Sequence, residues 1–294
     1  MLSVDKTCFR LNSKTNERYL YFLFISVLLF FIDINSKDLM INTSFKQISD
    51  IIKIAPELDI PNIILKNHCA LVPSQNFSFS KTKNGSLKKF VKEWDALEID
   101  THMADNGRYR LRRYGVFYLS QKSLHLDYQS NATFYQSLES NPINGGINRG
   151  FSSLSDSTIE SHFLHALIRL DFKNLPNSIT CKNKSWKIGV HQIKIKSFTG
   201  RIGLPTPEGI HRDDENFTVQ HLIDRHNIAS GENLFYGQSL NPSKEAEIKW
   251  LQKDFFDSYY FDKSVWHSVS PVESLDGINE GYRDVLLLDF VPRG

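Results

Sequence analysis

Two residues able to hold a metal ion, His211 and Asp213, stand two positions apart in the chain. On an extended strand, residues at positions i and i+2 point to the same side, so an imidazole and a carboxylate there can bind one ion. We therefore predict a strand over 209–213 that carries both side chains. His267, at the start of another strand-like run, is the predicted third ligand.

Two imidazoles and one carboxylate on one side of an ion leave the opposite coordination positions open. Non-haem Fe(II) oxygenases use this arrangement to bind a co-substrate and then O₂. Zinc could occupy the same three ligands, although its sites prefer tetrahedral geometry. A His-x-Asp pair is common by chance, so the prediction depends on the residues that follow it.

Arg283 strengthens the prediction because it opens the last strand-like run of the chain. A guanidinium there can pair bidentately with the distal carboxylate of 2-oxoglutarate while the keto acid end chelates the metal. The alternative is a structural salt bridge from Arg283 to Asp284 or Asp289.

Several motifs, in the right order, resemble those of the bacterial 2-oxoglutarate/Fe(II) dioxygenases that include L-isoleucine 4-hydroxylase. The resemblance covers most of residues 45–290. The motifs lie at 108–114, 190–192, 207–213, 221–228 with 231–232, 267–272 and 283–286.

The resemblance implies a mainly β fold with flanking helices (α+β) around a double-stranded β-helix, the cupin-like jelly roll. It also implies Fe(II), 2-oxoglutarate and O₂ as requirements, with succinate and CO₂ released on hydroxylation. By position, His211, Asp213 and His267 would be the iron ligands, and Arg283 would bind the co-substrate. One departure is Asp214, where the family pattern has glycine; its charge is expected near the mouth of the site.

Free aliphatic L-amino acids are one substrate class of the family, so a small-molecule substrate is expected. Two alternatives stay open: the same chemistry on a peptide or biosynthetic intermediate, and a non-catalytic cupin-like binding protein. A formal net charge of +2 offers no global field for a nucleic-acid partner, and none is expected. The carboxylate of Asp213 favours hydroxylation over halogenation, because a halide would need that coordination position. The sequence does not determine the oligomeric state.

Other polar residues are weaker candidates for the pocket. His191 and Gln192 could bind substrate or co-substrate from a strand, or could form a packed, hydrogen-bonded pair in the core. Arg212, between two predicted ligands, is a further candidate. Arg108, Arg110 and Arg112 share one face of a predicted strand; they could bind a carboxylate, but a solvated strand face is the favoured interpretation.

Hydrophobic spacing predicts amphipathic helices over 44–54, 86–97 and 158–170. A glycine-rich segment, 141–155, is either a lid or a connector. Short runs separated by turn residues indicate an antiparallel sandwich or barrel. The predicted strands are 108–119, 188–196, 209–213, 218–223, 258–261, 266–269 and 285–291.

Residues 40–294 are expected to form a single domain, with the β core mainly in 108–120 and 186–292. Residues 1–39 are expected to be an N-terminal extension whose apolar stretch, 19–32, is short for a membrane span. The extension is an uncleaved anchor, an atypical signal or a segment that the fold does not need. Any membrane association would go through that stretch. Three widely spaced cysteines favour a reducing compartment, so a cytoplasmic location is expected, with membrane tethering as the alternative.

Overall fold

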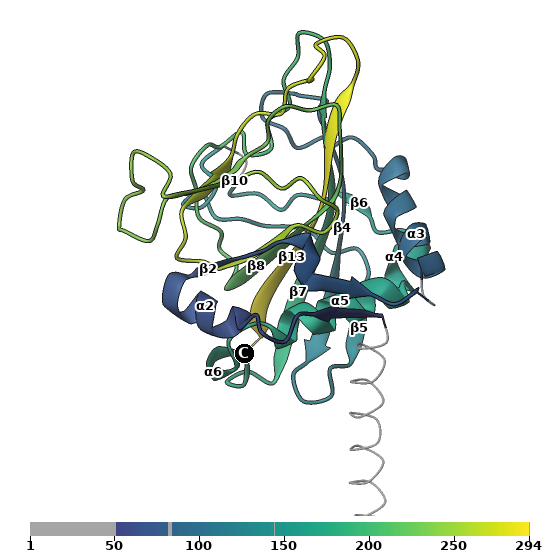
Figure 1. Cartoon of the computed structure of the whole chain (residues 1–294), viewed down its shortest axis with the longest axis vertical. Helices are drawn as coiled ribbons and strands as arrows, with labels where there is room; N and C mark the ends of the chain where they lie inside the picture. Colours follow the sequence, from purple (N-terminus) through teal and green to yellow (C-terminus); the bar gives the residue numbers. More distant parts are fainter. Residues whose placement is uncertain (1–50, 82–83, 144, 294) are drawn as a thin grey trace, which may run out of the picture. The chain divides into compact units, whose positions relative to one another are not determined.

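An eight-stranded sheet dominates the computed structural model, which describes residues 51–81, 84–143 and 145–293 (Figure 1). Its strands run in the order β2-β11-β8-β13-β7-β4-β5, and β6 pairs with β4. All its pairings are antiparallel except that of β6 with β4. The strands are β2 (Cys69–Val72), β4 (Arg110–Ser120), β5 (Leu126–Gln129), β6 (Ser152–Ser153), β7 (Ser185–Ser197), β8 (Phe217–His226), β11 (Ser258–Asp262) and β13 (Gly281–Arg293).

Two smaller sheets complete the β structure of the described residues. A three-stranded sheet has the order β10-β9-β12, and a two-stranded one joins β1 to β3. The described residues all belong to one compact unit. The bounds are β1 (Ile52–Ile54), β3 (Phe77–Phe79), β9 (Asn233–Phe235), β10 (Ile248–Trp250) and β12 (His267–Val269).

The central strands are amphipathic with a period of two, so each has a core side and a cavity side. In β13, Leu286, Leu288 and Phe290 are buried in the main hydrophobic core. The alternate residues, from Arg283 to Asp289, line a cavity on the other face. One continuous core therefore lies on the outer face of the large sheet, and the polar cavity lies on its inner face.

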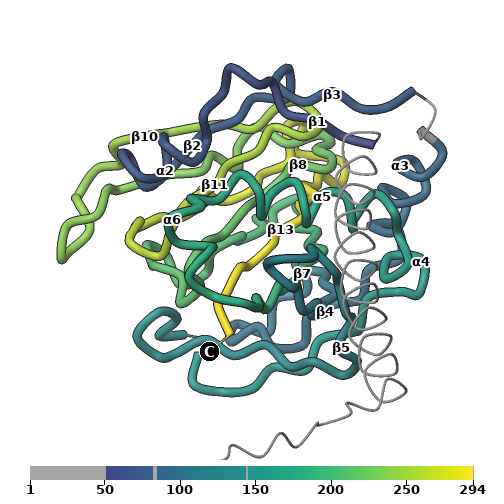
Figure 2. The backbone as a smooth tube through the Cα atoms, turned by 90° about the horizontal axis from the view of Figure 1, so that it is seen from below, coloured from purple at the N-terminus to yellow at the C-terminus, as the bar shows by residue number. Residues whose placement is uncertain are grey.

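Helix α5 covers the core side of this sheet, as Figure 2 shows from below. Its buried face includes Phe163, Leu167 and Phe172, which belong to the same core cluster as the strands. No helix in the described part of the chain is long and apolar enough to span a membrane. The α-helices are α2 (Ile60–Asn67), α3 (Asn84–Val91), α4 (Asp156–Ile159), α5 (His162–Lys173) and α6 (Asn177–Thr180), with 3₁₀ turns at Ser74–Asn76 and Lys92–Ala96.

The predicted helix over 86–97 is present as α3 followed by the 3₁₀ turn, and most predicted strands are present with bounds shifted by a few residues. The helix predicted over 158–170 is wrong as one element. It is interrupted after Ile159, because Ser161 caps a new helix by accepting a hydrogen bond from the amide of Leu164.

The helix predicted over 44–54 is wrong where the structure describes it. Ile52 and Ile54 instead pair with Phe79 and Phe77 in a β ladder, so tertiary pairing of β-branched residues overrides the helical spacing. Residues 44–50, the apolar stretch 19–32 and the expected domain start at residue 40 lie outside the described residues.

A buried polar cluster ties α5 to the outer face of the sheet. Asp171 Oδ2 lies 3.0 Å from Nε2 of His221, and Oδ1 accepts a 2.6 Å hydrogen bond from the hydroxyl of Tyr260. All three residues are fully buried. His221 does not line the cavity and belongs to this structural cluster.

We expect Asp171→Ala to lower the free energy of unfolding by about 3–5 kcal/mol, because it leaves a buried histidine and tyrosine unpaired. Urea denaturation measures this change. The matched control is Asp127→Ala, which removes the exposed pair between Asp127 and His125 and should cost at most about 1 kcal/mol. Equal losses in the two variants would contradict the role given to the cluster.

Candidate active site

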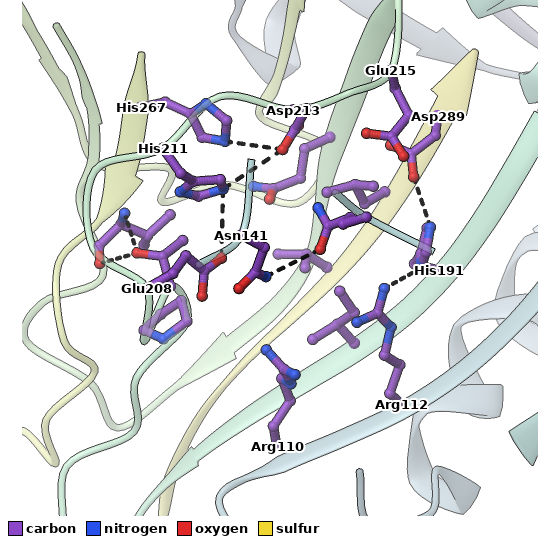
Figure 3. Close-up of a pocket in the computed structure, with 18 of the residues that line it drawn as sticks. Arg110, Arg112, Asn141, His191, Glu208, His211, Asp213, Glu215, His267 and Asp289 are labelled. Atoms are coloured by element: carbon purple, nitrogen blue, oxygen red, sulfur yellow. Dashed lines mark hydrogen bonds and ion pairs between the residues drawn. The ribbon is translucent and has the colours of Figure 1, made fainter. Parts of the chain in front are cut away.

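A cavity on the inner face of the large sheet contains the predicted metal ligands (Figure 3). The floor is built from inward-facing residues of β4, β7, β8, β11 and β13, and segments around Glu208, His267 and Phe134 close it. Because neighbouring strands present alternate residues to one face, residues far apart in sequence meet here.

His211, Asp213 and His267 lie together at one side of this cavity. Their ligand atoms are all within 4.8 Å of one another. Oδ1 of Asp213 is 3.6 Å from His211 Nε2 and 3.8 Å from His267 Nε2. Figure 3 shows the three side chains turned toward a common point.

The backbone explains this convergence, but it is not the strand that we predicted over 209–213. Gly209 has a φ of +79°, in the left-handed region, which interrupts an extended conformation. Only His211 is paired, through an isolated bridge to His267 with hydrogen bonds of 3.0 and 2.9 Å. That bridge places the two imidazoles side by side, with ring centroids 4.3 Å apart.

Both histidines are oriented as metal ligands usually are, with one ring nitrogen held by the protein. Nδ1 of His211 lies 3.0 Å from the carbonyl of Gly209, and Nδ1 of His267 lies 3.4 Å from that of Val265. Each Nε2 therefore faces the shared point. Burial is the main cause that lowers the pKa of His267 to about 4, and repulsion from the neighbouring His211 is the second. The low pKa favours the neutral, ligating form. This donor set fits a divalent iron ion.

Arg283 lies in the same cavity and is almost fully buried. Its Nη2 donates to Asn233 Oδ1 at 3.0 Å and to Gln252 Oε1 at 2.7 Å. Within the described residues it forms no ion pair with Asp284 or Asp289, which pair instead with a lysine and a histidine. The salt-bridge alternative is therefore wrong, and the guanidinium is available to an anion.

Of His191, Gln192 and Arg212, only His191 lines the cavity. Gln192 is wrong as a pocket residue, because the next residue of a strand must point to the opposite face; it is buried on the core side. Arg212 is also wrong: it stacks over Trp266 and donates to the carbonyls of Gln238 and Ser239, away from the cavity.

The favoured interpretation of the arginine strand as a solvated face is wrong for two of its three members. Arg110 and Arg112 are 6% and 7% exposed and line the cavity, whereas Arg108 is exposed and lies two residues before the strand begins. Arg110 pairs with Asp100 at 2.7 Å. The alternation was read correctly, but the strand's arginine face is turned inward because β4 pairs with β7 along the centre of the sheet.

Residues of the segment before β6 were missed as cavity residues. Phe134, Gln136, Asn141 and Arg149 all line the cavity. The glycine-rich composition of 141–155 was the only signal in the sequence. The stretch from Phe134 to Arg149, called the covering segment below, therefore covers the cavity and is more than a connector. It contributes an arginine and amide side chains to the lining.

Asp214, the departure from the family pattern, holds this covering segment in place. Its carboxylate accepts hydrogen bonds from the backbone amide of Ser137 at 2.6 Å, from the Ser137 hydroxyl at 3.0 Å, and from the Ser140 hydroxyl. These bonds lower its pKa. The charge expected at the mouth is therefore compensated by these hydrogen bonds. Asp214 also links the covering segment to the stretch of chain that carries Asp213.

Acidic residues at the far end of the cavity were also missed. Asp289 lies 2.7 Å from His191 Nε2, and Glu215 is buried close by. Burial, followed by repulsion from Asp213, raises the pKa of Glu215 to about 8. Burial likewise raises the pKa of Asp289. The alternating pattern of β13 could have identified Asp289, because it lies six residues after Arg283 on the same face.

Comparison with known proteins defines the class. A family model described as 2OG-Fe dioxygenase matches residues 91–289, more than half of the chain. The chain belongs to this family. Enzymes of the family require Fe(II), 2-oxoglutarate and O₂.

The curated relatives include L-isoleucine-4-hydroxylase of Bacillus thuringiensis, 29% identical over 189 residues, covering 63% of this chain and 75% of the relative. The 3(1)-hydroxy-L-isoleucine 4-dioxygenase of Pantoea ananatis (strain AJ13355) is 23% identical over 221 residues, covering 74% and 85%. Among solved structures, the crystal structure of IDO from Bacillus thuringiensis superposes with a TM-score of 0.67 at 21% identity, covering 82% of this chain and 99% of that one. The likeness to that structure shows that the fold is shared.

Proposed function

We propose that this protein hydroxylates an unactivated C–H bond of a free L-amino acid, with release of succinate and CO₂. Fe(II) would be held by His211, Asp213 and His267, and the distal carboxylate of 2-oxoglutarate by Arg283. The observation that carries the proposal is a three-ligand cluster in the same cavity as a buried arginine that has no counter-ion among the described residues.

In this proposal the iron, with 2-oxoglutarate and O₂, supplies the oxidising power, and the protein supplies binding, orientation and a dry site. His211 and His267 keep their Nε2 atoms toward the ion through their Nδ1 contacts with backbone carbonyls. Thr218 orients the Asp213 carboxylate by donating to Oδ2 at 3.1 Å. Arg283 would hold the co-substrate in one orientation.

The finer fold assignment, a double-stranded β-helix, belongs to the same proposal. It is supported by the cavity, which has the large sheet on one side and residues joined to the β9–β12 sheet on the other. A cytoplasmic location is also proposed, from the odd number and wide spacing of the cysteines.

The substrate class is supported by the two relatives whose names specify isoleucine or a hydroxyisoleucine. The test is a screen of free L-amino acids with the purified, Fe(II)-loaded protein, 2-oxoglutarate and O₂. We expect succinate together with a product heavier by one oxygen atom for at least one amino acid. Absence of both with every amino acid would overturn the substrate assignment, and hydroxylation of peptides alone would favour the alternative.

A further inference from the structure

Two cavity arginines, Arg112 and Arg149, have no carboxylate at ion-pair distance among the described residues. They are 7% and 1% exposed. Nη2 of Arg112 lies 2.5 Å from His191 Nδ1, and Nη2 of Arg149 donates to Gln136 Oε1 at 2.6 Å. The Nε atom of each arginine is buried without a hydrogen-bond partner. Each guanidinium thus has donors left for a ligand.

Aromatic rings fix the positions of these two cations. The Arg112 guanidinium lies 4.1 Å from the ring centroid of Phe151, and that of Arg149 lies 4.9 Å from the centroid of Phe134. Burial, followed by repulsion from Arg110, lowers the pKa of Arg112 to about 9. A buried cation without a counter-ion is costly, so an incoming anion would relieve an existing penalty.

An anionic group with unused capacity lies on the other side of the same cavity. Glu208 Oε1 is 3.5 Å from His211 Nε2, while Oε2 is buried without a hydrogen-bond partner. Figure 3 places Glu208 beside the metal-ligand cluster and Arg112 across the cavity from it. A carboxylate oxygen that lacks a donor there is suited to an ammonium group.

We propose that Arg112, Arg149 and Glu208 recognise the two charged ends of a free α-amino acid. The arginines would bind its carboxylate, and Glu208 would bind its ammonium group. This inference rests on the proposed function and deepens it, since a residue inside a peptide lacks both charges and would leave these groups unpaired. The substrate's apolar side chain would lie against the aliphatic lining of Ile193, Ile195, Val285 and Leu287.

The proposal requires two anion sites in the cavity, one for 2-oxoglutarate and one for the substrate carboxylate. Arg283 lies on β13 with its own amide partners, Asn233 and Gln252, while Arg112 and Arg149 lie on β4 and the covering segment. Separate sites allow the co-substrate diacid and the substrate carboxylate to bind together without exchanging places.

The experiment measures binding by calorimetry to the anaerobic protein loaded with Fe(II) and 2-oxoglutarate. The probes are the free L-amino acids, then the tightest of them as its amide and as its N-acetyl derivative. We expect each derivative to bind roughly 10- to 100-fold more weakly, since each loses one charged hydrogen-bonded contact. Arg149→Gln should weaken the free acid by a similar factor but leave the amide almost unchanged. Glu208→Gln should also weaken binding of the free amino acid, but it should leave binding of the N-acetyl derivative almost unchanged.

Controls separate this inference from the proposed function. Arg113→Gln removes a neighbouring arginine on the other face of β4, paired with Glu98, and should change affinity less than about twofold. Arg112→Gln repeats the carboxylate test in case the covering segment of the Arg149 variant is disordered. The affinity for 2-oxoglutarate, measured in parallel, should be retained in every variant.

Three outcomes are distinct. If a free amino acid binds and is hydroxylated, yet its amide binds equally well or the arginine variants bind it normally, the recognition proposal is overturned and the proposed function stands. If 2-oxoglutarate binds but no free amino acid does, both the substrate class and the recognition proposal are overturned. Matched losses for derivative and variant support the assignment of each charged end.

Discussion

Asp213→Ala protein is expected to convert 2-oxoglutarate to succinate more slowly than wild type by on the order of 10³-fold or more. Asp213 is the only anionic member of the ligand cluster, and its Oδ1 lies between the two Nε2 atoms. Changes that only reorient a metal ligand already cost about 10–100-fold, so removing a ligand should cost more. Succinate formation and iron content after dialysis both measure the effect.

Asp214→Ala is the matched control, because it removes the adjacent carboxylate, which faces Ser137 and Ser140 rather than the cluster. It should retain iron while loosening the covering segment. Normal iron content and turnover in the Asp213 variant would refute the ligand assignment. Loss of iron in both variants would show that the segment, rather than the carboxylate, had been disturbed.

The second large effect is expected for Arg283→Gln, which should weaken 2-oxoglutarate binding by about 10²-fold. Its guanidinium has no ion-pair partner among the described residues, and a charged, bidentate contact contributes roughly 1.5–3 kcal/mol. Glutamine keeps a hydrogen-bonding group of smaller size in the site. Equilibrium binding of 2-oxoglutarate to the anaerobic iron-loaded protein measures the change.

Arg293→Gln tests the same substitution at the end of the same strand, where the arginine stacks over Tyr118. It should leave the affinity for 2-oxoglutarate unchanged, and Arg283→Lys should recover part of the loss because the charge is kept but the planar fork is not. Unchanged affinity in the Arg283→Gln variant would place the co-substrate elsewhere in the cavity.

Most of the β structure could be predicted from local patterns. The alternation in β13, with Leu286 and Leu288 on one side and Arg283 and Asp289 on the other, is a property of the sequence itself. Patterns over short windows failed where a distant partner decided the conformation. Ile52 follows apolar residues at helical spacing in the sequence, but it pairs with Phe79 of β3 instead.

The candidate site divides in the same way. His211, Asp213, His267 and Arg283 were predicted from residue type, spacing and resemblance, and the structure brings all four to one cavity. Their roles in binding iron and 2-oxoglutarate are proposals that the variants above will test. The inward position of Arg112 was not predicted, because alternation identifies a shared face without showing which side of the sheet is enclosed.

The amino-acid sequence alone thus determined the period of the strands, the metal-binding residue types and their order along the chain, since these depend on neighbouring residues. Only the tertiary structure decided which strand face is enclosed, that Gln192 points away while His191 points in, and that Arg149 and Glu208 meet the same cavity. Those outcomes depend on long-range pairing between β4, β7 and β13 and on a covering segment held by Asp214, contacts that no local window of sequence contains.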